Sequence, residues 1–205
     1  MRVVRLLSDG IWVNGSRATR LGRAVAVPVA TAVLAASAFA TSRSEKGLQT
    51  LNKQVLSAVN RFRVTHGLRP LRESAALDRS ARQHSFQMGR RGYFAHSSAN
   101  GTAFWRRIRN YYAARGFAYW SVGENLLWSS PSVSAGHAMQ MWIASPGHLR
   151  NLMTAQWRQI GISAVRVPDA PGVFHRLPVT IITTDFGVLK IEEKDTKTMP
   201  VAVPA

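Results

Sequence analysis

The sequence predicts one domain of mixed α/β class, with helices in its first part and strands in its last. From residue 49 to 144, apolar side chains recur every three or four positions, which is the spacing of a buried helix face. From 159 to 187 the composition shifts to β-branched and other apolar residues, which favours strands. Because 46% of the 205 residues are hydrophobic, the chain can enclose a core.

Four helices are expected, over residues 49–66, 74–91, 101–112 and 132–144. Gly67 ends the first of them. Their inward faces carry, in chain order, Leu51, Val55, Val59, Phe62, Leu77, Ala81, His84, Met88, Phe104, Trp105, Ile108, Ala135, Met139 and Trp142. A histidine on such a face, His84, is expected to be packed in the core with a hydrogen-bond partner.

Two strands are expected after the helices. They are the segments QIGISAVRV, residues 159–167, and PVTIITTDFG, residues 178–187. The residues between them, 168–177, form a loop or a loose hairpin connection. Helices and strands therefore belong to a single alternating domain.

The two ends of the chain differ from the domain, which we place at residues 41–188. Residues 1–40 carry five arginines, then an apolar run that ends in Ala-Phe-Ala, which is the pattern of a signal peptide cleaved after Ala40. An uncleaved N-terminal membrane anchor is the alternative. Either interpretation predicts a secreted, periplasmic or envelope location, membrane-anchored if the segment stays. Residues 189–205 are expected to form a flexible tail.

Composition limits the chemistry and the partners. The chain has no cysteine, which excludes disulfides, thiolate nucleophiles and cysteine-type zinc sites. Its net charge of +17 attracts polyanions. Since an exported protein rarely meets nucleic acid, an anionic envelope component is the expected partner. The alternative is that the scattered arginines only solvate the surface.

Three stretches stand out against this scaffold: GYFAHSS, SVGENLLWSS and MWIASPGHLRNLM. In the third, Ser145 suits a helix N-cap and Pro146 the first helical position. His148 then lies in the first turn, where the helix dipole disfavours a charged ring and keeps the imidazole neutral. Asn151 follows one turn later, near His148. Glu124 in the second stretch could be a turn residue bound to backbone amides.

Together with LN…RFRVTHGLRPL, WRQIGI and TTDFG, these stretches resemble the CAP superfamily of cysteine-rich secretory proteins, antigen 5 and pathogenesis-related proteins, in its cysteine-free bacterial branch. The resemblance covers about residues 50–188 and rests on the order and spacing of the motifs. It implies a three-layer α/β/α sandwich around a small, mostly antiparallel sheet.

The resemblance also implies a site. In this family the histidine of F-x-H, the glutamate of GEN and the histidine of GH-x-x-N meet in a surface cavity, which here gives His96, Glu124 and His148. Two imidazoles and a carboxylate suit a divalent metal such as zinc, with a position left for water. The residues expected beside the cavity are Asn125, Ser145 and Asn151.

One departure from the family pattern bears on function. Many members carry a second glutamate where this chain has Ser145, so the cavity loses a carboxylate and a possible general base. We therefore expect first a binding protein for a small hydrophobic molecule, a peptide or an envelope component. A metal-dependent hydrolase using His96, Glu124 and His148 is one alternative. A basic envelope-interaction module with a vestigial cavity is the other. Whether the protein is an enzyme stays open.

Overall fold

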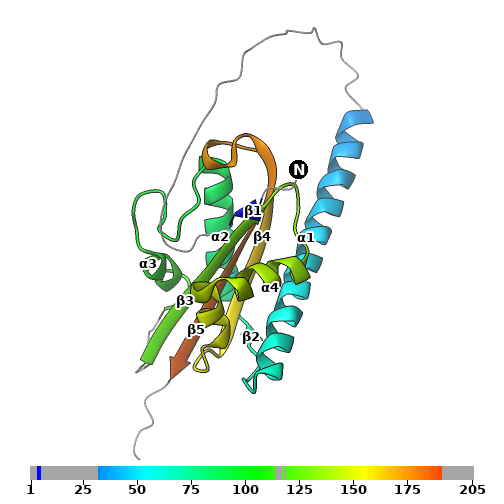
Figure 1. The fold of residues 1–205 in the computed structure, drawn as a ribbon. Coiled ribbons are helices and arrows are strands. Elements are labelled where there is room, and N and C mark those ends of the chain that lie inside the picture. The colour runs from blue at the N-terminus through cyan, green and yellow to red at the C-terminus, as the bar shows by residue number, and fades with distance from the viewer. Residues whose placement is uncertain (1–3, 6–31, 114–116, 118, 191–205) are drawn as a thin grey trace, which may run out of the picture.

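A computed structural model describes residues 4–5, 32–113, 117 and 119–190. Its elements are β1 (Val4–Arg5), α1 (Ala32–Thr65), β2 (Arg72–Glu73), α2 (Ala75–Arg91), α3 (Phe104–Arg109), β3 (Tyr119–Ser129), α4 (Ala135–Ala144), α5 (Pro146–Met153), β4 (Gln159–Ala170), the 3-10 turn η1 (Gly172–Phe174) and β5 (Leu177–Lys190). Helices cover both faces of one twisted sheet (Figure 1).

The sheet has the strand order β1-β3-β5-β4-β2. Its centre is antiparallel, because β5 pairs with β3 on one side and with β4 on the other. The short strand β1 is antiparallel to β3, and β2 is parallel to β4. The α/β/α class and the mostly antiparallel sheet expected from the family resemblance are confirmed.

Alternation along the strands divides the core into two layers. Helices α1, α4 and α5 pack against one face of the sheet, and α2 and α3 pack against the other. The first face is mostly apolar and includes Leu127, Ile182 and Phe186, but it also carries the buried Asn125, which bonds to α5. Part of the second face is also apolar, where Leu126 and Ile181 pack beneath α2. Its polar part holds the candidate site.

Helix α1 is longer than the sequence predicted. It begins at Ala32 rather than near 49, and so includes the end of the predicted signal segment. Residues 1–3 and 6–31 lie outside the described part, and cleavage after Ala40 stays a prediction. None of the helices in the described ranges is long and apolar enough to cross a membrane.

Helix α2 follows the prediction closely. Ser74 holds the N-cap position, and Gly92 ends the helix in the left-handed region at φ 71°, where its N–H donates to the Met88 carbonyl. His84 is fully buried and its Nε2 lies 2.9 Å from the Ala95 carbonyl oxygen, so the expectation of a packed, hydrogen-bonded histidine is confirmed.

Two predictions need correction. The third helix covers Phe104–Arg109 rather than 101–112, and Trp105, predicted to point inward, is exposed. The stretch around Glu124 is not a turn, since Tyr119–Ser129 form the long strand β3. Glycine and asparagine beside Glu124 concealed this strand, because both residues are typical of turns.

The last two strands extend past their predicted ends. β4 reaches Ala170 and β5 covers Leu177–Lys190, with η1 in the connection, which is therefore a hairpin. β5 continues through residues 189 and 190, which were assigned to the tail. The rest of that tail, 191–205, lies outside the described residues.

Candidate functional site

Glu124 lies at the centre of the site. Strand alternation directs it to the face covered by α2 and α3, where its side chain is fully buried. Its Oε1 accepts a hydrogen bond of 2.8 Å from Nδ1 of His96, and its Oε2 forms an ion pair with Arg107. Burial alone would raise the pKa of Glu124, but these two partners hold that pKa below its usual value.

His96 is the part of this arrangement that meets solvent. It lies in the segment between α2 and α3, and 42% of its side chain is exposed. An ionised carboxylate can only accept hydrogen bonds, so the Nδ1 of His96 carries the proton given to Glu124. In the neutral ring, Nε2 is then an acceptor. The ring of Phe104 lies beside it, with centroids 6.2 Å apart.

Arg107 fixes both of these residues, and the sequence predictions did not include it. It is 3% exposed, and besides the pair with Glu124 its Nη1 donates to the His96 carbonyl at 3.0 Å. The sequence held a weak signal. Arg107 follows Phe104 by three positions and precedes Ile108, so it shares the inward face of that helix.

A second carboxyl group lies beside Glu124. Asp185 of β5 is its register partner across the antiparallel pair and is fully buried. Burial, and then the charge of Glu124, raises the pKa of Asp185 well above its usual value. Arg107 offsets one buried negative charge, so burial of a second one beside Glu124 favours the protonated form of Asp185. This residue belongs to the TTDFG motif, yet its role was not predicted.

His84 completes the buried side of the site. Burial lowers the pKa of His84 to about 4, and Glu124 and Arg107 are the charges that act on it most strongly. The neighbouring Ser80 lies one turn earlier on the same inward face of α2 and contributes to the environment of Asp185. His84 is therefore both a core residue and a buried neighbour of Glu124.

Helix α5 carries His148 within electrostatic reach of His96, and the convergence of His96, Glu124 and His148 in one cavity stays a prediction. His148 is buried in its first turn. Burial, and then the charge of His96, lowers the pKa of His148 to about 4, so its ring is neutral at physiological pH.

Two asparagines tie α5 to β3. Asn125 Nδ2 donates to the carbonyl of His148 at 3.1 Å. Asn151 Nδ2 donates to the Glu124 carbonyl at 3.0 Å and to Asn125 Oδ1 at 2.8 Å. Both residues fix the backbone around Glu124, and their place beside a cavity stays a prediction.

Ser145 occupies the N-cap position of α5, but its side chain accepts no cap hydrogen bond. It is buried, and within the described residues its hydroxyl has no partner. The predicted position is thus correct and the predicted cap interaction is wrong. A small hydroxyl at this place leaves Glu124 and Asp185 as the carboxyl groups of the site.

The donor set fits a metal only in part. Both oxygens of Glu124 are engaged, one by a cationic guanidinium, so Glu124 suits the role of an outer carboxylate that orients His96. The imidazoles of His96 and His148 are the groups that could ligate a cation. Over the described ranges, no three histidine, aspartate or glutamate side chains form a ligand cluster. Zinc binding stays a prediction.

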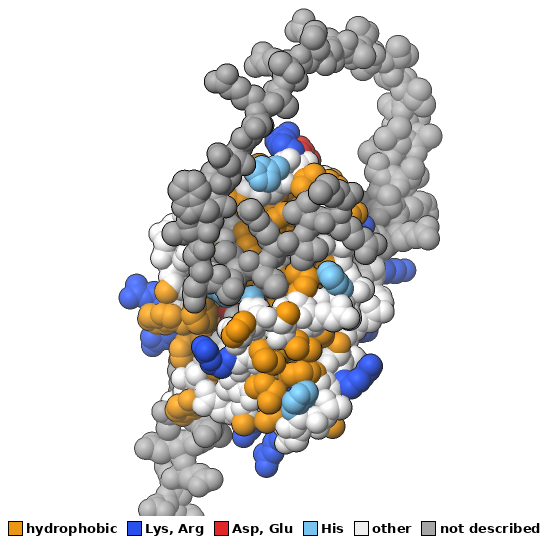
Figure 2. Space-filling view, viewed as in Figure 1, with side chains coloured by type: hydrophobic (Ala, Val, Ile, Leu, Met, Phe, Trp, Pro, Cys, Tyr) orange, Lys and Arg blue, Asp and Glu red, His pale blue; other side chains and the backbone are white. Residues whose placement is uncertain are grey.

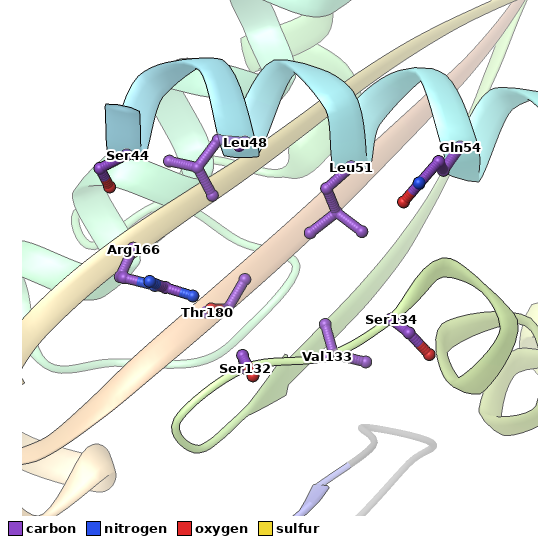
Figure 3. A pocket seen from close by; sticks show the side chains of 10 residues that line it. Ser44, Leu48, Leu51, Gln54, Ser132, Val133, Ser134, Arg166 and Thr180 are labelled. Carbon is purple, nitrogen blue, oxygen red and sulfur yellow. The ribbon is translucent and has the colours of Figure 1, made fainter. Parts of the chain in front are cut away.

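A separate groove lies beside α1. Figure 3 shows Leu48 and Leu51 of α1 facing Val133 of the β3–α4 connection across a pocket of about 550 Å³. Arg166 and Thr180 lie at its sheet side. This pocket combines an apolar wall with one cationic side chain.

Comparison with known proteins decides the family. A sequence profile of the cysteine-rich secretory protein family, CAP, matches residues 56–180, which hold His96, Glu124, Arg107 and His148. The chain belongs to the CAP family. The resemblance inferred from the motifs is therefore confirmed.

Two relatives from Bacillus subtilis match the CAP segment. YkwD is 26% identical over 125 residues, covering 61% of this chain and 46% of YkwD. The membrane protein YlbC is 28% identical over 122 residues, covering 59% of this chain and 34% of YlbC. The chain thus spans less than half the length of either relative.

Two solved structures share the CAP fold. An extracellular SCP-domain protein from Bacillus anthracis superposes with a TM-score of 0.52 at 24% identity, over 69% of this chain and 41% of that one. An outer surface protein from Borrelia burgdorferi gives a TM-score of 0.50 at 19% identity, over 67% of this chain and 92% of that one. At these identities the likeness concerns the fold.

Proposed function

We propose that this CAP protein is a non-catalytic binding protein of the cell envelope, which holds a hydroxyl or amide N–H group of an envelope component at His96. The observation that carries the proposal is the hydrogen bond from His96 Nδ1 to Glu124, with Arg107 behind it. This chain of contacts orients the ring and makes Nε2 a fixed acceptor on a side chain that is 42% exposed.

Binding is favoured over metal-dependent hydrolysis by the charges around Glu124. A metal ion bound by Glu124 would have to displace Arg107 from this carboxylate. Arg107 is a buried cation that also donates a hydrogen bond to the His96 carbonyl. Ser145 offers no carboxylate to replace it. The contacts among Arg107, Glu124 and His96 support a fixed hydrogen-bond acceptor at His96 rather than a site that activates water.

The envelope location is supported by two lines. Residues 1–40 carry the pattern of an export signal. The names of the two structural relatives describe an extracellular and an outer surface protein. The excess of 22 Lys and Arg over 9 Asp and Glu in residues 41–205 adds a general attraction to anionic envelope polymers.

The basic surface by itself accounts less well for specific binding. Figure 2 shows Lys and Arg side chains spread around the margin of one face and not gathered into a patch. Spread charge gives weak, salt-sensitive attraction. A fixed acceptor such as His96 gives a contact whose loss is felt at any salt concentration.

Sedimentation with purified peptidoglycan, a polyanion rich in hydroxyl and amide groups, tests the proposal. We expect the parent protein to co-sediment at low and high salt, and His96→Ala to lose most of the salt-resistant fraction. His137→Ala, an exposed histidine of α4, is the matched control. Binding that disappears with salt but survives His96→Ala would instead support the basic-surface module. Metal-dependent turnover lost in His96→Ala would support the hydrolase.

A second candidate function is binding of a small hydrophobic molecule in the groove beside α1. The groove pairs Leu48, Leu51 and Val133 with Arg166, which suits an alkyl chain bearing an anionic head (Figure 3). Displacement of a fluorescent fatty acid would test it. We expect Leu51→Glu to abolish binding, while Lys53→Glu, with a larger charge change on an exposed side of the same helix, leaves it intact.

A further inference from the structure

A small polar pocket lies on the α2 and α3 side of the molecule, apart from His96. It has a volume of about 230 Å³. Its walls come from α2, from the segment that follows His96, and from α3. The lining side chains are Gln83, Gln87, Arg91, Ser98, Ala99, Asn100, Thr102, Arg107 and Asn110. Eight of these nine residues are polar and none is acidic.

The walls of the pocket are fixed by hydrogen bonds. The turn on one side is closed by Ser98 N–H to the Thr102 carbonyl at 2.8 Å and by Thr102 N–H to Asn100 Oδ1 at 3.1 Å. Arg107 at the rear is held by Glu124 and by the His96 carbonyl. A pocket with such walls loses little conformational freedom when a ligand enters.

The third wall carries polar groups that lack protein partners. Gln83, Gln87 and Arg91 lie at intervals of four residues and so share one face of α2. Gln83 and Gln87 are half-buried. Among the described residues, none of these three side chains has a hydrogen bond or an ion pair that the structure records. Half-buried amides of this kind are satisfied by water or by a ligand with hydroxyl groups.

From this lining we infer that the pocket binds a sugar carboxylate. The amides and hydroxyls offer both donors and acceptors, which matches a ring that carries several hydroxyl groups. Arg91 offers a guanidinium for a carboxylate, and no acidic side chain of the lining opposes an anion. The inference goes beyond the proposed function, because it assigns a second site and a ligand class.

Titration of the full protein with D-glucuronate, followed by NMR, tests this site. We expect saturable shifts of the backbone amides of residues 98–102, with an affinity in the millimolar range. The methyl ester of glucuronate keeps the hydroxyls and lacks the charge, so it should bind about tenfold more weakly, as expected for loss of a charge-assisted contact. Equal binding of acid and ester, or no saturable shift, would overturn the assignment.

Variants separate this site from general charge and from the first site. Arg91→Gln should weaken glucuronate about tenfold, whereas Arg109→Gln, an exposed arginine of α3 outside the pocket, should leave it unchanged. An equal loss in both variants would mean that only net charge attracts the ligand. His96→Ala should bind glucuronate normally while losing salt-resistant binding to peptidoglycan, so the two measurements report on separate sites.

Discussion

The same strands of the sheet build two unlike faces. On the side of α1, α4 and α5, β3 and β5 contribute apolar residues such as Leu127, Ile182 and Phe186. On the side of α2 and α3, the same two strands begin with apolar residues and then contribute Glu124 and Asp185. The first face is held mainly by apolar packing, and α5 on that side carries the buried, titratable ring of His148. The second is held by buried charges, so its stability is tied to their partners and protonation.

The largest expected effect comes from removing the buried cation of the polar face. Arg107→Met keeps much of the volume but leaves Glu124 ionised without its partner, and should lower the free energy of unfolding by about 3–5 kcal/mol. Urea denaturation measures it. Arg109→Met, on the exposed side of the same helix, should change stability by less than about 0.5 kcal/mol. Equal small effects would mean that Arg107 is solvated.

The pH dependence of stability should come from two buried histidines, His84 on α2 and His148 on α5. The pKa values of His84 and His148 are lowered to about 4, so the unfolded chain takes up protons between about pH 6.5 and 4 that the folded protein does not. Stability should therefore fall over this window, by on the order of 2–3 kcal/mol for each ring. Thermal melts in steps of pH measure the slope.

Single variants show which histidine causes the fall in stability between pH 6.5 and 4. His148→Gln should flatten the decline between pH 6.5 and 4, because the ring that resists protonation is gone. His137→Gln, on the exposed surface of α4, should keep the parent slope. A parent protein whose stability is level across the window would contradict the buried, neutral state of both rings.

A smaller effect, opposite in sign, is expected at the second carboxyl. The pKa of Asp185 is raised, so at pH 7 the unfolded chain gains by ionising it and the folded protein does not. Asp185→Asn removes that penalty and should stabilise the protein by on the order of 1 kcal/mol at pH 7. The gain should vanish below about pH 3.9, where Asp is protonated in both states. A destabilised variant at pH 7 would show that Asp185 is ionised.

The smallest effect is expected from zinc. Because Glu124 is paired with Arg107, we expect calorimetry to find only weak zinc binding. The affinity for zinc should fall as the pH is lowered, since protons compete for the imidazoles. Ser145→Glu supplies another carboxylate and should tighten it, and His148→Ala should weaken it. Identical titrations of the parent and both variants would place the metal elsewhere.

Local sequence patterns predicted the helices well and the site incompletely. The buried face of α2 could be predicted from periodicity, because the spacing of Leu77, Ala81 and Met88 places all three on one side of a helix. β3 was missed because Gly123 and Asn125 resemble a turn, and only pairing with β5 makes this stretch extended. Pairing along the sheet is a long-range contact that no local pattern contains.

The same reason explains which site residues were missed. His96, Glu124 and His148 could be named because their motifs resemble those of a family. Arg107 and Asp185 act through contacts between α3, β3 and β5, which bring together residues far apart in sequence. The sequence showed which residues could do chemistry, while burial and charge pairing determine which groups are ionised.

We infer that Glu124 fixes the tautomer of His96, so that Nε2 is presented to solvent as an acceptor. Nitrogen NMR of histidine-labelled protein at neutral pH tests it most directly. We predict that the proton of His96 lies on Nδ1 in the parent protein, and that Glu124→Gln shifts the ring toward the Nε2–H tautomer, which is the commoner one in solvent. A parent protein with the proton of His96 on Nε2 would show that Glu124 does not set the tautomer of this ring.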